Sequence, residues 1–156
     1  MTKTLKTTLF IALVAVMTAC GSEKKYERNY TFENGMWDRF NKLQFEMPAD
    51  VKPGNYDIIF TICLQETFEY DRFPIFVTLK TPSGEERTNE IEMKIKDNDR
   101  FYGQQDGGMY VITQKLWDGI SIADTGVSIV TVENLIPKIQ TPGVQSVSMI
   151  MKSAGQ

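Results

Sequence analysis

The sequence predicts an all-β fold, a single antiparallel β-sandwich that is jelly-roll-like, from its short apolar period, its turn signals and its lack of helical spacing. Roughly eight segments alternate apolar and polar residues, which is the period of a half-buried strand. Turn-forming pairs such as Asp118-Gly119 are expected to separate these segments. Glu133–Ile139 could form one helical turn at most, because Pro137 limits it.

Each strand is predicted where the alternation is clearest. Ile91–Ile95 alternates with charged residues, so this segment should have one face in water. Tyr56–Leu64 should be a central strand, because Ile59 and Cys63 make its second face apolar as well. The other expected strands, in chain order, are Tyr26–Phe32, Lys42–Met47, Ile75–Leu79, Met109–Gln114, Val127–Thr131 and Val147–Met151.

The beginning of the chain predicts a bacterial lipoprotein signal peptide in residues 1–19, with Cys20 as the lipidated first residue of the mature chain. Lys3 and Lys6 precede an apolar run, and the small pair Thr18-Ala19 stands before the cysteine. The apolar core spans about nine residues, whereas a membrane-spanning helix requires roughly 20. A transmembrane anchor is therefore disfavoured, and a cleaved signal without lipid is the remaining alternative.

Residues 20–25 are predicted to be the lipidated cysteine and a short tether, followed by one domain over residues 26–152. Fatty chains on Cys20 would hold the protein at the membrane, because several buried chains together bind far more firmly than one. The polar residues Gly21–Lys25 can reach about 17 Å at full extension. The domain should therefore remain near the bilayer surface, where its partners should also be found.

Charge argues against nucleic acid and anionic lipid surfaces as partners of the domain. The whole chain has a formal net charge of −3, and loss of Lys3 and Lys6 with the signal makes the mature chain more acidic. Both kinds of partner require a basic face. The sequence thus predicts attachment to the membrane through lipid on Cys20 and no nucleic-acid binding.

The chain contains no histidine, which argues against an enzyme. Histidine is the usual general base near neutral pH and the commonest metal ligand. Cys63 therefore lacks a base to activate it, and its apolar neighbours predict a small residue buried in the core. An enzyme that uses paired carboxylates is the least favoured reading. We expect no catalytic residues and no cofactor.

One acidic segment could be read as a metal site. Asp97-Asn98-Asp99, followed by Asp106, offers oxygen ligands that suit calcium. The spacing does not match the helix-loop-helix calcium motif, because Phe101 and Tyr102 stand where a ligand and a glycine are needed. A solvated turn is the preferred interpretation, and no metal is expected.

Aromatic residues in or beside loops are the candidates for binding. Trp37 and Trp117 are expected to close the ends of the core. The strongest candidate for an exposed contact patch is Tyr70-Asp71-Arg72-Phe73, because two charges stand between two rings. The second candidate is the segment Phe101–Gly108, with Phe101 and Tyr102. The predicted partner-binding residues are Tyr70, Arg72, Phe73, Phe101 and Tyr102, which could grip a protein or stack on sugars.

The mature chain resembles the gliding-motility lipoproteins of Bacteroidota, the H-type (GldH), over about residues 26–151. The resemblance is carried by ordered landmarks. They are Tyr30-Thr31-Phe32, Asn34–Trp37, Leu43–Glu46, the strand Tyr56–Leu64, Tyr70 with Phe73–Val77, Pro82-Ser83-Gly84, Asp99–Gly103, Asp124-Thr125-Gly126 and Gly143–Val147. The chain departs from the pattern at Leu64-Gln65-Glu66, which lacks the family's arginine, and at Thr88-Asn89-Glu90.

The resemblance implies an accessory part of the gliding-motility and type IX secretion apparatus on the periplasmic face of the outer membrane, without catalytic residues. Its partners would be envelope proteins, including other motility or secretion lipoproteins. Only one carboxylate follows Cys20 in the tether, and the missing acidic run also favours the periplasmic face. The expected function is a non-catalytic protein-binding or assembly component. The alternative is a glycan-binding module held at the cell envelope.

Overall fold

The protein was analysed as a computed structural model, which describes residues 25–155. The predicted signal peptide, the lipidation of Cys20 and most of the tether lie outside the described residues. Within them, nearly every element is a strand, and the predicted all-β class is confirmed. The helical element of this part is one 3-10 turn, η1 (Glu33–Gly35). Glu133–Ile139 forms no helix, since its first residues belong to a strand and the rest to a loop.

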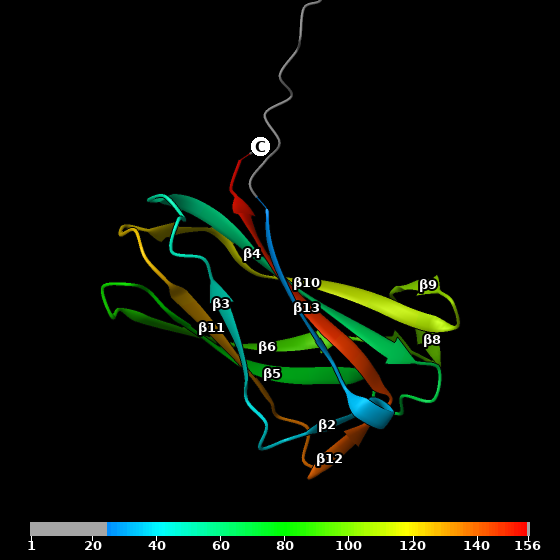
Figure 1. The fold of residues 1–156 in the computed structure, drawn as a ribbon. Coiled ribbons are helices and arrows are strands. Elements are labelled where there is room, and N and C mark those ends of the chain that lie inside the picture. Colours follow the sequence, from blue (N-terminus) through cyan, green and yellow to red (C-terminus); the bar gives the residue numbers. More distant parts are fainter. Residues whose placement is uncertain (1–24, 156) are drawn as a thin grey trace, which may run out of the picture.

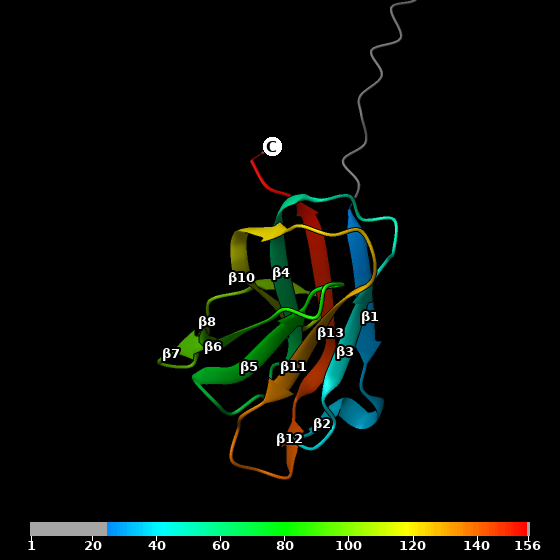
Figure 2. The same ribbon diagram turned by 90° about the vertical axis from the view of Figure 1, so that its left-hand side faces the viewer.

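The strands form two stacked antiparallel sheets (Figures 1 and 2). The first sheet is five-stranded, in the order β1-β13-β4-β10-β9. Its strands are β1 (Tyr26–Thr31), β13 (Val144–Ser153), β4 (Gly54–Gln65), β10 (Met109–Ile122) and β9 (Gln104–Asp106). The predicted central strand is confirmed, because β4 lies between β13 and β10.

The second sheet is four-stranded, in the order β3-β11-β5-β6. Its strands are β3 (Leu43–Met47), β11 (Ser128–Asn134), β5 (Arg72–Lys80) and β6 (Glu86–Lys94). The eight long strands of the two sheets, without the short β9, can be numbered 1 to 8 along the chain. The first sheet then has the order 1-8-3-6, and the second sheet has the order 2-7-4-5. This interleaving is the strand order of a jelly roll. Two short pairs complete the fold: β12 (Gln140–Pro142) with β2 (Met36–Asp38), and β7 (Lys96–Asp97) with β8 (Arg100–Phe101).

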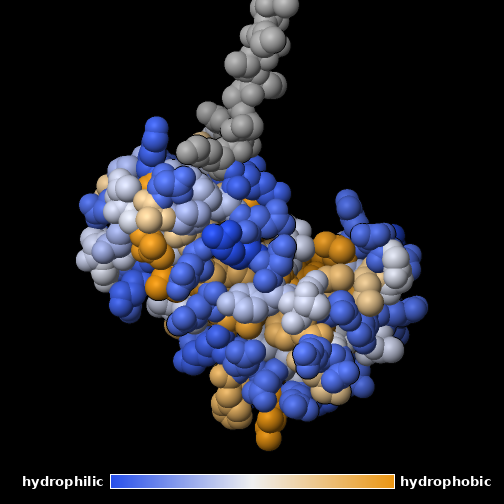
Figure 3. Space-filling view, viewed as in Figure 1, coloured by the Kyte–Doolittle hydropathy of each residue, from blue (hydrophilic) through white to orange (hydrophobic). Residues whose placement is uncertain are grey.

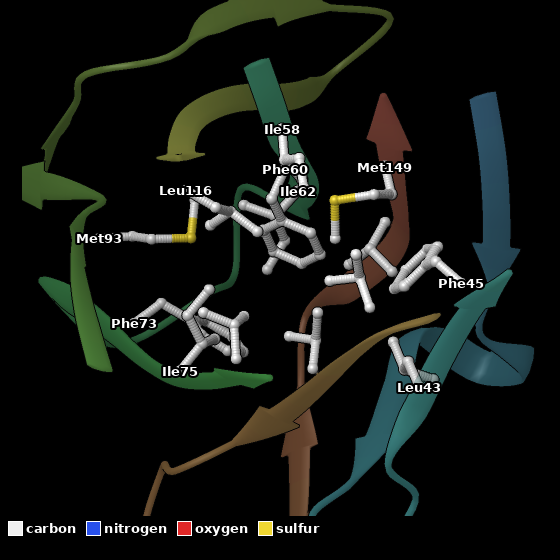
Figure 4. Close-up of a cluster of buried hydrophobic side chains, with 14 of the residues drawn as sticks. Leu43, Phe45, Ile58, Phe60, Ile62, Phe73, Ile75, Met93, Leu116 and Met149 are labelled. Atoms are coloured by element: carbon white, nitrogen blue, oxygen red, sulfur yellow. The ribbon is translucent and has the colours of Figure 1, made fainter. Parts of the chain in front are cut away.

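A single apolar core fills the space between the sheets. Along β4, Ile58, Phe60 and Ile62 alternate inward and have no exposed surface. Figure 4 shows Phe60 pointing into the same space as Phe45 of β3 and Met149 of β13. The rings of Phe45 and Phe60 meet edge to face, with centroids 6.5 Å apart. The two-residue period therefore sets the inner face, as the sequence predicted.

The outer face of the first sheet differs from the prediction at Cys63. The Cys63 side chain points away from the core and is half-buried between the neighbouring strands. The prediction of a buried core residue is therefore wrong. Cys63 follows Ile62 and precedes Leu64, which both point inward, so strand alternation places it on the opposite face. Trp117 is likewise only partly buried, packed at the margin of the core, whereas Trp37 is fully buried.

Asp118-Gly119 is not a turn between strands but an irregularity inside β10. The register with β4 shifts on both sides of Trp117, so β10 contains a bulge and continues to Ile122. Asp57 holds this bulge, since its carboxylate accepts a hydrogen bond from the Gly119 N–H at 2.9 Å and another from Lys115 Nζ at 3.0 Å. These donors lower the pKa of Asp57, the backbone N–H most of all.

The two ends of the sandwich have different roles in the chain path. β1 and β13 are neighbours, with Tyr26 opposite Met151, so the chain enters the domain beside its last strand. Figure 1 shows this end at the top, and β2 with β12 at the bottom. A tether from Cys20 would therefore join the domain at the end remote from β2 and β12.

Candidate functional site

The acidic segment at residues 97–99 forms a tight hairpin turn. Asn98 and Asp99 have φ angles of 47° and 62°, and Asp97 pairs with Arg100 across the turn. Positive φ at both central residues is typical of a type I′ turn, which short polar residues tolerate. The interpretation as a solvated turn is confirmed. No group of three or more acidic or thiol side chains suited to a metal ion occurs in residues 25–155.

Backbone hydrogen bonds join this hairpin to the loop that precedes β5. The Asp71 carbonyl accepts the N–H of Ile95 at 2.9 Å and that of Lys96 at 3.3 Å. Lys96 also donates from Nζ to the Phe68 carbonyl at 3.0 Å. The structure therefore brings together the two segments that the sequence singled out separately, residues 70–73 and 101–108.

Phe101 serves mainly to fix the hairpin. Its ring stacks on Tyr110 of β10, with centroids 3.9 Å apart and planes 7° from parallel. Lys96 Nζ lies 5.6 Å from the centre of the Phe101 ring, which is a cation–π distance. Phe101 is half-buried as a result, whereas its neighbour Tyr102 is 58% exposed. Tyr102 is thus the residue of this pair that is free to contact another molecule.

Tyr70 is half-buried at the surface of the same loop. Its ring packs against Phe68, with centroids 5.6 Å apart, and Lys138 Nζ lies 5.3 Å from the ring centre. Lys138 is also 3.6 Å from Glu69. The nearby Tyr70 side chain, and to a lesser extent the Glu69 charge, raises the pKa of Lys138. Tyr70 therefore links the β5 loop to the loop before β12.

Phe73 does not belong to an exposed contact patch, so this part of the prediction is wrong. The structure places it in the core with no exposed surface, stacked between Trp37 at 5.6 Å and Phe68 at 5.8 Å. Strand alternation begins at Arg72, which is partly exposed and lies 3.6 Å from Glu92 on β6. Phe73 thus supports the loop from below and offers nothing to a partner, while Arg72 remains available.

Two shallow hollows open beside Tyr102. The first, of about 530 Å³, is lined by Asp97, Asn98, Arg100, Phe101 and Tyr102. The second, of about 570 Å³, lies between β6 and β10 and includes Glu92, Lys94, Ile112 and Gln114. Tyr102 borders both hollows. An exposed ring between two open concavities suits contact with a protein or a sugar.

Two exposed apolar residues beside β2 and β12 were missed from the sequence. Phe40 is 77% exposed and Ile139 is 67% exposed, on adjacent loops. The Arg39 N–H donates to the Ile139 carbonyl at 2.8 Å, and the Phe40 N–H donates to the Asp38 carboxylate at 2.8 Å. Figure 3 shows apolar atoms at the foot of the molecule, below the charged surface. The polar neighbours of Phe40 are the sequence signal of a turn, which would have predicted an exposed ring.

Comparison with known proteins adds the family. The family model described as GldH lipoprotein matches residues 24–150. No curated protein sequence matches the chain. In the described residues, no helix is both long and apolar enough to cross a bilayer. The family match covers most of the chain and agrees with the suspected resemblance, so this protein belongs to the GldH lipoprotein family.

Proposed function

We propose that this protein is a non-catalytic binding or assembly component of the cell envelope, serving the gliding-motility and type IX secretion apparatus. Lipid on Cys20 anchors it to the outer membrane, on the periplasmic face. Family membership supports a membrane-anchored lipoprotein in a gliding-motility context. The missing general base and the arrangement of exposed rings support binding rather than chemistry.

The observation that carries the proposal is the position of the exposed apolar residues relative to the chain entry. Positions along β4 measure the separation. Tyr26, where the chain enters, lies at the level of Ile58, because both are paired with the same residue of β13. Tyr110, on which Phe101 stacks, is paired with Leu64. At about 3.3 Å per residue, these levels are roughly 20 Å apart along the sheet. Contact residues thus gather away from the tether, where a partner can approach an anchored domain.

We call this region the distal surface and define it as Tyr70, Arg72, Phe101, Tyr102, Phe40 and Ile139. Its exposed members are held by backbone hydrogen bonds at their bases, including Tyr102 N–H to the Ile95 carbonyl at 2.9 Å. Rigid aromatic side chains lose little conformational entropy on binding and often dominate the energy of protein interfaces. Such a surface favours a protein partner with an apolar contact area.

Site-specific photo-cross-linking of the full lipoprotein in cells tests the proposal. A photoreactive phenylalanine analogue replaces Tyr102 or Phe40, which are both exposed rings, and the matched control replaces Thr88 on the outward face of β6. We expect a defined envelope protein to be cross-linked from Tyr102 or Phe40 and not from Thr88. Equal yields from all three positions, or none from any, would contradict a distal binding surface.

The second candidate is a glycan-binding lipoprotein, favoured by the exposure of Tyr102 between two open hollows. Aromatic rings at such positions can stack on sugar rings. A glycan array probed with the mature protein separates the candidates. Saturable binding to one defined sugar, lost in Tyr102→Ser and retained in Phe76→Ser, would favour the glycan reading over a protein partner.

A further inference from the structure

β10 has an incomplete outer edge. β9 pairs only with Met109–Val111, and in the described part of the chain no other strand is hydrogen-bonded as a ladder to that side of β10. β10 continues for eleven residues beyond Val111, to Ile122, and pairs there only with β4. The segment that follows Val111 therefore has an open edge, to which another strand could be added next to β9.

The register shows which backbone groups point to this edge. The Gln65 N–H donates to the Gly143 carbonyl, and the Ala154 N–H donates to the Asn55 carbonyl. The backbone N–H and C=O groups of odd-numbered residues of β4 therefore point toward β13. The backbone groups of even-numbered residues of β4 consequently point toward β10, where Ile62 is opposite Ile112. Alternation then directs the backbone groups of Thr113 and Lys115 away from β4, toward the open edge.

Side-chain amides occupy part of the place of a strand. Gln114 Nε2 donates to the Lys115 carbonyl at 3.0 Å, and Asn89 Nδ2 on β6 donates to the Leu116 carbonyl at 3.3 Å. These amides satisfy carbonyls that a neighbouring strand would otherwise bind. The backbone of Thr113 has no such partner among residues 25–155. An unpaired backbone edge is a template for an added strand.

The other edges of the sandwich are protected more fully than β10 is at Thr113. β6 places Glu90, Glu92 and Lys94 along its outer edge, and charge disfavours strand addition. β3 is covered at Gln44, whose carbonyl accepts the Tyr30 hydroxyl at 2.6 Å. On the open part of β10, Thr113 and Gln114 are uncharged, and the charge of Lys115 is engaged with the carboxylates of Asp57 and Asp118 at 3.0 and 2.9 Å.

The hollow of about 570 Å³ lies directly against this edge. Ile112 and Gln114 of β10 form one wall and Glu92 and Lys94 of β6 form the other, with Tyr102 as a further lining residue. Glu92 is 3.6 Å from Arg72, whereas Lys94 makes no ion pair with any other residue from 25 to 155. The hollow can therefore receive the inward side chains of an added strand and favours a carboxylate near Lys94.

We propose that an extended segment of a partner protein adds to the edge of β10 at Thr113–Lys115, antiparallel to β10 and in line with β9. This inference rests on the proposed protein-binding function and specifies its mode. Main-chain hydrogen bonds to Thr113 hold the segment, and its alternate side chains, one of them acidic, enter the hollow between β6 and β10. Tyr102, which lies in both the distal surface and the hollow, packs beside it.

Linear peptides provide the probe. A phage-displayed library of random linear peptides is panned against the full lipoprotein in detergent micelles, and amide hydrogen exchange is measured with a selected peptide bound. Thr113→Pro removes the outward N–H without removing a bond to β4, Gln114→Glu places a negative charge inside the hollow that repels the acidic side chain of the added segment, and Thr113→Val is the matched control. Thermal unfolding checks that each variant folds. If Thr113→Pro does not fold, Gln114→Glu decides the result.

We expect selected peptides to slow exchange at the Thr113 amide by about tenfold or more. Thr113→Pro and Gln114→Glu should each weaken binding by about tenfold, and Thr113→Val should change it little. Unchanged exchange at Thr113, or equal binding by all variants, would overturn the inference. If the Tyr102 photo-probe still captures its partner in the Thr113→Pro and Gln114→Glu proteins, strand addition is wrong while the proposed function stands.

Discussion

Phe73→Ala should severely destabilise the domain, because Phe73 is a core residue beneath the distal surface. Its ring has no exposed surface and stacks on Trp37 and Phe68. Truncation of a buried phenylalanine costs about 3–5 kcal/mol of unfolding free energy, including the cavity left behind. Most domains have only about 5–15 kcal/mol in total. The melting temperature should therefore fall by roughly 10–20 °C.

Thermal unfolding followed by tryptophan fluorescence measures this loss, since Trp37 is in direct contact with Phe73. Phe76→Ala is the matched control, because Phe76 lies on the same strand but points outward and is half-buried. It should cost clearly less than Phe73→Ala. The reasoning fails if Phe73→Ala leaves the melting temperature within about 2 °C of the wild type, or if both variants lose the same stability.

Three further changes have defined outcomes. The pKa of Asp57 is lowered in the folded protein by its bonds with the Gly119 N–H and Lys115. The stability that these bonds give is present above about pH 4 and is lost as the pH falls through the folded pKa. Denaturation profiles of Asp57→Asn should therefore be flatter in that acid range than those of the wild type. Gly103→Ala should destabilise strongly, because the added Cβ would collide with the Val111 backbone oxygen of β10, whereas Gly54→Ala meets only ordinary contacts and serves as its control in thermal unfolding. Cys20→Ser should release the protein from the membrane fraction in immunoblots of fractionated cells; full retention with normal function would refute lipid anchoring.

Strand alternation made most of the fold predictable, and its errors have local causes. β4 follows the two-residue period from Ile58 to Gln65, so its inner face could be identified directly. The charged neighbours Asp71 and Arg72 predict an exposed position for Phe73, yet Arg72 is already the first residue of β5 and alternation turns the next side chain inward. The charged neighbours indicated a surface loop, but they did not show where the loop ended.

The candidate site could be predicted only in its parts. Asp118-Gly119 has the composition of a turn, and only the partner groups of Asp57, distant in sequence, reveal it as a bulge. The meeting of the Asp71 loop with the β7–β8 hairpin likewise depends on long-range backbone hydrogen bonds. Such bonds involve the backbone N–H and C=O groups that nearly every residue carries, so no pattern of side chains predicts them.

The pairing of β1 with β13 gives the domain a mechanical property. Six consecutive residues of β1, from Tyr26 to Thr31, are matched to β13. If the chain is anchored through Cys20 as proposed, a force between a partner at the distal surface and the membrane would pull β1 along its own axis and load its hydrogen bonds with β13 in shear. Hydrogen bonds loaded in shear resist together instead of breaking one at a time, so this pairing would be strongest in the direction of the pull.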